Sequence, residues 1–154
     1  MATRVLRGPD DIQRLAAFVG TMPSFPMTVT ITKGDNRRDA QNRLAQRWFS
    51  DIARQLGDVT HDEVRAECKV THGVQILRAE NEAFRQSWDS TFGRLDYGSQ
   101  REAVKNLDVP VTRLMTVKQM TKFMDAVHSF WASRGFALTD PEALKYEAEF
   151  GGAA

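Results

Sequence analysis

Cysteine, histidine and acidic side chains gather in residues 61–72 at spacings that could serve a metal ion or a nucleophile. Cys68 and His72 are four residues apart, on one face of a helix, and His61 or Glu63 could supply a third ligand. Zinc sites usually show more ligands at closer spacing than this single C-x-x-x-H pair. A buried cysteine with surface histidines is therefore the simpler interpretation. A Cys–His hydrolase is disfavoured, because such partners rarely come from adjacent turns of one helix.

A metal-dependent nuclease using Asp62, Glu63 and His72 is the remaining enzymatic alternative. Glu63 is better explained as the capping-box partner of Thr60, and His128 as a boundary residue on the flank of an apolar helix. Neither G-x-x-x-x-G-K-[ST] nor G-x-G-x-x-G occurs, which disfavours an ATP motor or a dinucleotide enzyme. The sequence therefore predicts no catalytic centre, no metal and no cofactor.

Arginine is the residue type whose spacing is most informative. Arg43, Arg47 and Arg54 fall within about 40° of one another on a helical wheel, opposite the apolar residues of the same helix. Only two acids are placed to pair with them, Asp39 with Arg43 and Asp51 with Arg47. This excess of arginine predicts a surface that holds a negatively charged ligand, although an ordinary solvated helix face would show a similar pattern.

Further basic and polar residues adjoin the three arginines. Lys33, Arg37 and Arg38 lie just before the helix and could extend the basic strip around its N-terminus, where free N–H groups and the helix dipole favour a phosphate. Asn42 and Gln46 lie near the arginines and could donate hydrogen bonds to phosphates or bases.

The elements that must position these residues form a helix-rich α+β domain with a small antiparallel sheet. Alternation in "MTVTITKG", from Met27, predicts a half-buried strand, and "TRVLR", from Thr3, a short edge strand. Gly73 is expected to end a helix, leaving 74–77 as strand or loop. Helices are predicted at 11–18, 39–56, 61–72, 79–92, 99–107 and 117–134, with a last short one capped by Thr139 and Glu142. The 117–134 helix is expected to begin with a capping box of Thr116 and Gln119 and to carry an apolar stripe of Met120, Phe123, Met124, Val127, Phe130 and Trp131.

Composition predicts a single globular domain of 154 residues with a basic strand–helix part (1–57), a helical part (58–150) and a frayed tail (151–154). Residues 1–57 carry nine Lys/Arg against five Asp/Glu, and residues 58–154 carry twelve against fifteen, so +4 and −3 make the net +1. This asymmetry indicates either an anionic partner or opposite surfaces that meet in an oligomer. A lone cysteine, no membrane-length apolar run and no secretory signal predict a cytoplasmic protein.

Three segments resemble the NinB family, the recombination proteins of lambdoid phages also called Orf. "RRDAQNRLAQRWFSDIARQL" (37–56) follows the alternating segment and contains the Gln-Asn-Arg that opens the family's long helix. "CKVTHGVQIL" (68–77) and "VTRLMTVKQMTKFMDAVHSFWASRGFALTD" (111–140) follow in the family's order. The family's basic C-terminal helix is replaced by the acidic "DPEALKYEAEF" (140–150), so a C-terminal DNA contact is not expected.

The resemblance implies a non-enzymatic recombination mediator, encoded by a phage or prophage and acting in the bacterial host. Such proteins bind single-stranded DNA, act beside the host single-strand-binding protein, assist recombinase loading, and form intertwined homodimers around a central channel. The alternative is an adaptor whose arginines dock an acidic partner tail without DNA affinity of its own. The predicted DNA-binding residues are Lys33, Arg37, Arg38, Asn42, Arg43, Arg47 and Arg54.

Overall fold

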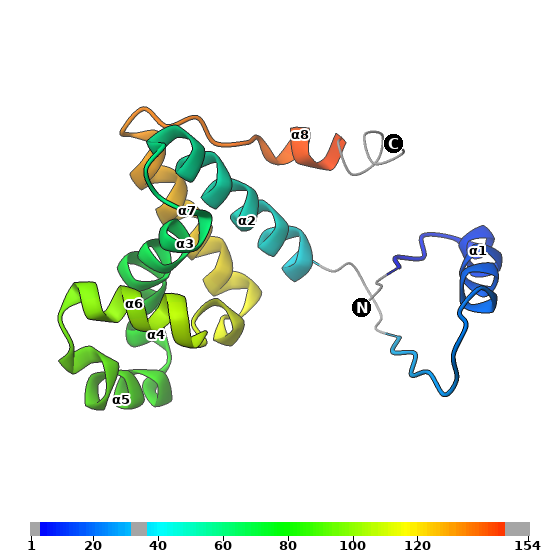
Figure 1. The fold of residues 1–154 in the computed structure, drawn as a ribbon, viewed down its shortest axis with the longest axis horizontal. Coiled ribbons are helices and arrows are strands. Elements are labelled where there is room, and N and C mark those ends of the chain that lie inside the picture. The colour runs from blue at the N-terminus through cyan, green and yellow to red at the C-terminus, as the bar shows by residue number, and fades with distance from the viewer. Residues whose placement is uncertain (1–3, 32–36, 147–154) are drawn as a thin grey trace. The chain divides into compact units, whose positions relative to one another are not determined.

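The computed structural model describes residues 4–31 and 37–146. By internal contacts the chain divides into an N-terminal unit, residues 1–34, and a main unit, residues 35–154. The single domain expected for the whole chain, divided near residue 57, remains a prediction. Every regular element among the described residues is helical (Figure 1). The elements are α1 (Pro9–Gly20), α2 (Arg37–Leu56), α3 (His61–Cys68), a π-helix η1 (Lys69–Gly73), α4 (Val74–Glu80), α5 (Glu82–Ser90), a 3-10 helix η2 (Phe92–Arg94), α6 (Tyr97–Leu107), a 3-10 helix η3 (Thr112–Leu114), α7 (Val117–Ala132) and α8 (Pro141–Tyr146).

The core of the main unit forms where α2 packs on α3 and α7 (Figure 1). Each helix contributes one apolar stripe, as the 3.6-residue period requires. Phe49 and Ile52 of α2 and Phe123 of α7 are almost fully buried, and the Phe49 and Phe123 rings meet edge to face at 6.5 Å. The stripe predicted for the 117–134 helix, from Met120 to Trp131, is confirmed as its core-facing side.

Two predicted capping boxes are present and fix where α3 and α7 begin. Thr60 accepts from the backbone N–H of Glu63, and the Glu63 carboxylate accepts from the backbone N–H of Thr60. Thr116 and Gln119 make the same reciprocal pair at the start of α7. The end predicted for the long helix is also confirmed, because α2 ends at Leu56 and Gly57 follows with φ +83°, a conformation that favours glycine.

The predicted break at Gly73 is wrong, because α3, η1 and α4 run on from one to the next. Gly73 has helical dihedrals, φ −67° and ψ −47°, and residues 74–77 lie in α4. A Cβ atom on Gly73 would lie 2.8 Å from Cγ1 of Val111. Gly73 therefore allows close packing against residues 111–123 and does not end the helix.

The predicted α+β class is also wrong, because no described residue lies in a strand and the main unit is a helical domain. The described part of the alternating segment, residues 27–31, has no partner strand among the described residues, and neither does the described part of "TRVLR". The apolar side of the alternation is uncovered, since Val29 is 58% and Ile31 86% exposed. Alternation shows which side chains could face a core, but a strand also needs a ladder of hydrogen bonds to a neighbour.

The N-terminal unit has no buried residue within its helix α1. Pro9 occupies the first turn of α1, and the Asp11 carboxylate accepts from the backbone N–H of Arg7 at 2.8 Å. Several large apolar side chains of this unit are exposed, including Phe25 at 77%. These residues do not form a core of their own.

Candidate nucleic-acid interface

The outer face of α2 carries the three arginines that the helical wheel placed together. Residues on the opposite side of the helix, among them Trp48, Phe49 and Ile52, are buried in the core. Arg43 is exposed and makes no hydrogen bond or ion pair with any described residue, so the pairing expected with Asp39 is not formed. Its guanidinium group can therefore bind an external anion without breaking an existing contact.

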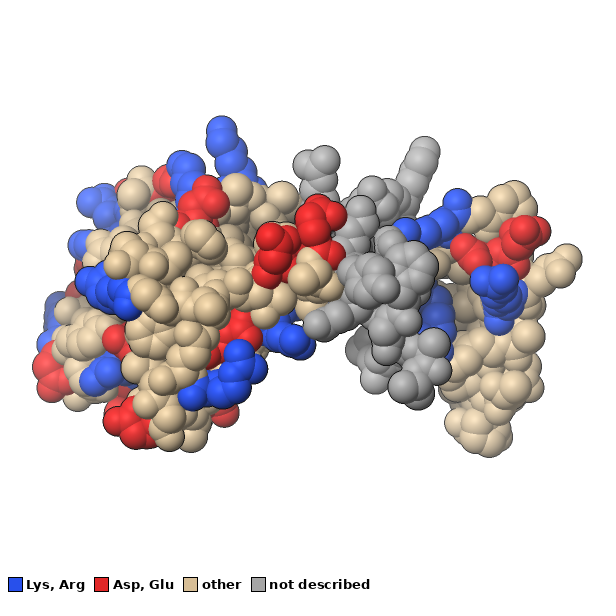
Figure 2. Space-filling model, turned by 90° about the horizontal axis from the view of Figure 1, so that it is seen from above, with Lys and Arg blue, Asp and Glu red and all other residues tan. Residues whose placement is uncertain are grey.

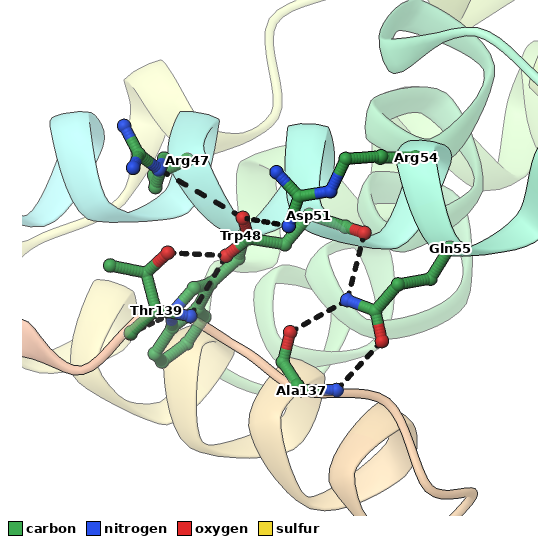
Figure 3. Close-up of polar contacts among 7 residues, drawn as sticks. All are labelled: Arg47, Trp48, Asp51, Arg54, Gln55, Ala137 and Thr139. Carbon is green, nitrogen blue, oxygen red and sulfur yellow. Dashed lines mark hydrogen bonds and ion pairs between the residues drawn. The ribbon is translucent and has the colours of Figure 1, made fainter.

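Arg47 and Arg54 lie on either side of one buried carboxylate (Figure 3). Nε of Arg47 is 3.9 Å and Nη2 of Arg54 is 3.4 Å from Oδ1 of Asp51, whose side chain is only 3% exposed. The Arg47 pair was predicted, whereas the Arg54 pair was not. Both guanidinium groups remain accessible, with the Arg47 side chain 42% and the Arg54 side chain 73% exposed. Asp51 thus holds two cations on this face while offsetting one charge.

The other oxygen of Asp51 holds the segment that follows α7. Oδ2 accepts from the backbone N–H of Thr139 at 2.8 Å and from its hydroxyl at 2.6 Å. Trp48 donates its indole N–H to the Thr139 carbonyl at 2.7 Å, and the Gln55 amide both donates to and accepts from the backbone of Ala137 (Figure 3). Thr139 was predicted to cap α8, but its side chain is used here, and Asp140 accepts from the Glu142 N–H instead.

Arg38 does not share the face of Arg43. Its guanidinium group donates to the backbone carbonyl of Arg113, and Gln41, nearby on α2, donates to the Thr121 hydroxyl at 2.8 Å. Asn42 is exposed, one position before Arg43 and therefore turned about 100° from it. Lys33 and the side chain of Arg37 lie outside the described residues. The structure therefore brings Arg43, Arg47 and Arg54 together and turns Arg38 toward η3.

A second group of cations lies around Arg113. This group, called the Arg113 cluster below, consists of Arg38, Arg65, Lys69 and Arg113. Arg113 donates to the Asp108 carbonyl at 3.0 Å and lies 3.7 Å from its carboxylate. Arg65 and Lys69 are one helical turn apart on the α3–η1 helix, a spacing at which like charges repel.

The charges of the Arg113 cluster are only partly balanced. Lys69 is buried, and this burial, with repulsion from Arg65 and Arg113, lowers its pKa to about 8 despite the opposing effect of Asp108. Nε of Arg65 lies 3.5 Å from Oδ1 of Asp62 but is buried without a hydrogen-bond partner. Four cations with two acids, Asp62 and Asp108, leave an excess positive charge that a bound anion would offset.

The Arg113 cluster was not predicted from the sequence, because four separate elements contribute to it. One local signal was available, the unbalanced Arg65–Lys69 pair at i and i+4. The position of Arg113 depends on the turn after α6, where Asp108 adopts φ +51°. On the face drawn in Figure 2, acidic and basic residues of the main unit are interspersed, so that face carries no extended patch of one charge.

The residues considered for metal or nucleophilic chemistry have structural contacts. No three His, Cys, Asp or Glu side chains of residues 4–31 and 37–146 are placed to hold a metal ion. Cys68 is buried, and burial raises the pKa of its thiol to about 12. His72 packs edge to face on Phe130 at 5.1 Å, and burial, followed by the charge of Arg134, lowers its pKa. Glu63 is engaged in the capping box.

Comparisons with known proteins leave the family resemblance as an expectation. No protein-family model, curated protein or solved structure matches the chain. Within the part that the structure describes, no helix combines the length and apolar character needed to cross a membrane. The features that bear on function are therefore Arg43, Arg47 and Arg54 on α2 and the Arg113 cluster.

Proposed function

We propose that this protein is a non-enzymatic DNA-recombination mediator that binds single-stranded DNA. The observation that carries the proposal is Arg43, exposed and without a partner among the described residues, in line on α2 with two guanidinium groups held by Asp51. Arg43 to Arg54 spans about 16 Å along the helix at 1.5 Å per residue. A row of that length can neutralise several phosphates of one strand without reading its sequence.

The Arg113 cluster supports the same ligand. It contains the buried Lys69 and the largely buried Arg65, whose positive charges a phosphate bound at the cluster would offset. Arg38 joins the cluster to the first turn of α2. A strand that crosses the start of α2 could therefore contact both groups of cations.

The mediator role extends this binding to recombination in a bacterial host, in the cytoplasm, with the protein encoded by a phage or prophage. DNA held through its backbone leaves the bases available for pairing, as a protein that assists recombinase loading beside the single-strand-binding protein requires. The family resemblance supports this role. The measurement is loading of a recombinase onto strand coated with single-strand-binding protein, with and without this protein.

DNA binding is tested by fluorescence anisotropy with a labelled single-stranded oligonucleotide at low and moderate salt. The doubly substituted Arg43→Ala/Arg47→Ala protein should bind at least tenfold more weakly at low salt, because two phosphate contacts are lost. Arg85→Ala is the matched control, since Arg85 is an exposed helix arginine paired with Glu82 on α5. Absence of binding by the wild-type protein at low salt, or equal loss in the control, would contradict the proposal.

The homodimer is part of the proposal and is supported by the N-terminal unit. Phe25, Val29 and Ile31 are more than half exposed, and α1 buries none of its residues. Apolar groups of this size are commonly covered in an oligomer. Sedimentation of the wild type and of Phe25→Asp/Ile31→Asp should show a dimer that the double substitution converts to monomer, whereas a wild-type monomer at micromolar concentration would exclude it.

An adaptor function is favoured by one specific contact. Arg47 and Arg54 already bind the carboxylate of Asp51, so the guanidinium groups of this face are placed to accept a carboxylate. An acidic partner tail could therefore dock on the same arginines. The two functions differ in that the adaptor has no DNA affinity of its own, so the anisotropy measurement separates them.

A further inference from the structure

A cavity of about 380 Å³ lies on the main unit, lined by residues of η1, α4, α5, η2 and α6. Its volume falls within the range of small-molecule sites, roughly 300 to 1,000 Å³. None of the α2 arginines and none of the Arg113 cluster line it. The cavity is therefore a separate feature that the proposed DNA surface does not explain.

Apolar and aromatic side chains form part of the cavity wall. Val70, Val74 and Trp88 line it and are otherwise buried in the core. The Trp88 ring stacks on Phe84 at 5.7 Å with an interplanar angle of 15°, which fixes its orientation. Gly93 lies against Trp88, where a Cβ would be 2.9 Å from the Trp88 carbonyl oxygen, so only glycine lets η2 approach this closely.

Tyr97 is an exposed aromatic residue of the same wall. It is 46% exposed, and its hydroxyl is hydrogen-bonded to the Thr71 hydroxyl, which fixes the ring beside the cavity. The Arg101 guanidinium lies 4.9 Å from the ring centroid. Arg101 itself does not line the cavity, so the Tyr97 ring is the stacking surface of this wall, the kind of surface on which unstacked nucleic-acid bases lie.

The charged groups that line the cavity neutralise each other. Nε of Arg78 donates to Oδ1 of Asp89 at 2.7 Å, and Nη2 donates to Oδ2 at 3.0 Å. This two-point ion pair occupies both side chains, and no other charged residue lines the cavity. A phosphate or an acidic peptide would have to displace Asp89 from Arg78, so the cavity favours a neutral ligand.

Two amides provide the hydrogen-bonding groups that such a ligand needs. Gln75 is exposed and makes no hydrogen bond with any described residue. Gln100 uses its NH₂ group on the Leu95 carbonyl at 3.0 Å, which leaves its own carbonyl oxygen available as an acceptor. A side-chain amide can donate and accept side by side, and this pattern matches the edge of a nucleobase.

We propose that this cavity binds a single unstacked nucleobase between the Tyr97 side and the apolar wall, with Gln75 and Gln100 on its polar edge. A neutral, flat heterocycle with donors and acceptors on its edge fits an aromatic wall, two amides and no net charge. The base can come from single-stranded DNA or from a free nucleoside. The inference extends the proposed function and does not depend on it, because no phosphate contact is required.

The first experiment uses free nucleosides, which lack phosphate, and detects binding by saturation-transfer NMR. Adenosine, guanosine, cytidine and thymidine at millimolar concentration should receive saturation from the wild-type protein. Gln75→Leu/Tyr97→Ala should weaken this binding about tenfold, because stacking and the amide contact are both removed. Gln86→Leu is the matched control, an exposed glutamine of α5 that does not line the cavity.

The second experiment identifies the source of the base with a single-stranded oligonucleotide containing one internal 2-aminopurine. A base taken up from the strand should change its fluorescence on binding to the wild type, and the double cavity variant should abolish the change while anisotropy still reports binding. Uptake seen only with nucleosides assigns the cavity to free nucleosides, and uptake seen only with the oligonucleotide assigns it to a strand.

The proposal of a base site and the proposal of a DNA-binding surface can be contradicted independently. Arg43→Ala/Arg47→Ala should leave nucleoside binding unchanged, so nucleoside binding without oligonucleotide binding would contradict the mediator function and keep the base site. If the oligonucleotide binds in a salt-sensitive way, but no nucleoside receives saturation and the 2-aminopurine fluorescence does not change, the base site alone is overturned. Signals that persist in Gln75→Leu/Tyr97→Ala would also overturn it.

Discussion

Asp51 and Thr139, separated by 88 residues, are joined by two hydrogen bonds to one carboxylate oxygen, from the Thr139 N–H at 2.8 Å and from its hydroxyl at 2.6 Å. The same carboxylate holds Arg47 and Arg54 through its other oxygen. One buried acid therefore fastens the segment after α7 to α2 and also positions two arginines of the proposed DNA surface.

Replacement of Asp51 by alanine should lower the free energy of unfolding by roughly 3 kcal/mol, because the charge-assisted hydrogen bonds are lost and both Thr139 donors, the N–H and the hydroxyl, lose their acceptor. Thr139→Val removes only the hydroxyl contact and should cost about 1.5 kcal/mol. Urea unfolding followed by tryptophan fluorescence measures both. Equal small effects for the two variants would show that Asp51 is a solvated residue without this role.

The arginines of α2 should contribute unequally to DNA binding. Arg43 has no described partner, whereas Arg47 and Arg54 are both paired with Asp51, so a phosphate would compete with a carboxylate at Arg54 but not at Arg43. We expect Arg43→Ala to weaken binding more than Arg54→Ala and to reduce the slope of log affinity against log salt by about 1. The measurement is anisotropy over a series of salt concentrations.

A comparison of two further variants checks the origin of that difference. Asp51→Asn removes the charge that competes with phosphate for Arg54. In this background, Arg54→Ala should therefore weaken DNA binding more than it does in the wild type. If Arg43→Ala and Arg54→Ala have equal effects in both backgrounds, the ion pair with Asp51 does not control access to Arg54.

Local sequence patterns predicted the helices well where the cause of each helix is local. The α2 stripe, the α7 stripe and the Thr60 and Thr116 capping boxes depend on residues within one or two turns, and all four are present. Gly73 was misinterpreted because its role is set by Val111, 38 residues away, rather than by its neighbours in sequence.

The strands and the full basic surface could not be predicted in the same way. Alternation in residues 27–31 identifies a possible face but not a pairing partner, and no described segment supplies one. Arg38 was expected to extend the basic strip around the start of the helix, but its hydrogen bond to the Arg113 carbonyl turns it toward η3. Prediction therefore failed where the contact joins distant segments.

Gly73→Ala tests the close packing of η1 against the 111–115 turn. Alanine is the better helix former, but its Cβ would lie 2.8 Å from Cγ1 of the fully buried Val111. We expect a net loss of about 1–2 kcal/mol in the free energy of unfolding. In a double-mutant cycle with Val111→Ala, the combined loss should be smaller than the sum of the two single losses, and additivity would contradict the steric explanation.

Cys68 should not react with thiol reagents while the protein is folded. Burial raises the pKa of its thiol to about 12, so almost none is thiolate near pH 8, and the side chain is inaccessible. Modification by a disulfide reagent should be very slow in buffer and fast in concentrated urea. Rapid stoichiometric reaction of the folded protein would show that α3 or α7 opens locally at this position.

Lys69 should make stability increase with pH in the alkaline range. Burial and the charges of Arg65 and Arg113 lower its pKa to about 8 from 10.5, so the folded protein binds this proton less tightly than the unfolded chain does. Below about pH 8 both states are protonated and the folded state carries the full unfavourable effect. As pH rises from about 8 toward 10.5, the folded state loses the proton first, so the free energy of unfolding should increase.

Lys69→Met isolates this effect from other titrating groups. Methionine has a similar length without a charge, so the variant should be more stable than the wild type at pH 7, and the difference should shrink by pH 9.5. Urea midpoints at several pH values measure the difference.

A phosphate bound at the Arg113 cluster would stabilise protonated Lys69, so saturating single-stranded oligonucleotide at pH 8.5 should cause proton uptake by the wild type and less by Lys69→Met. Equal uptake by both proteins would place the bound strand away from Lys69.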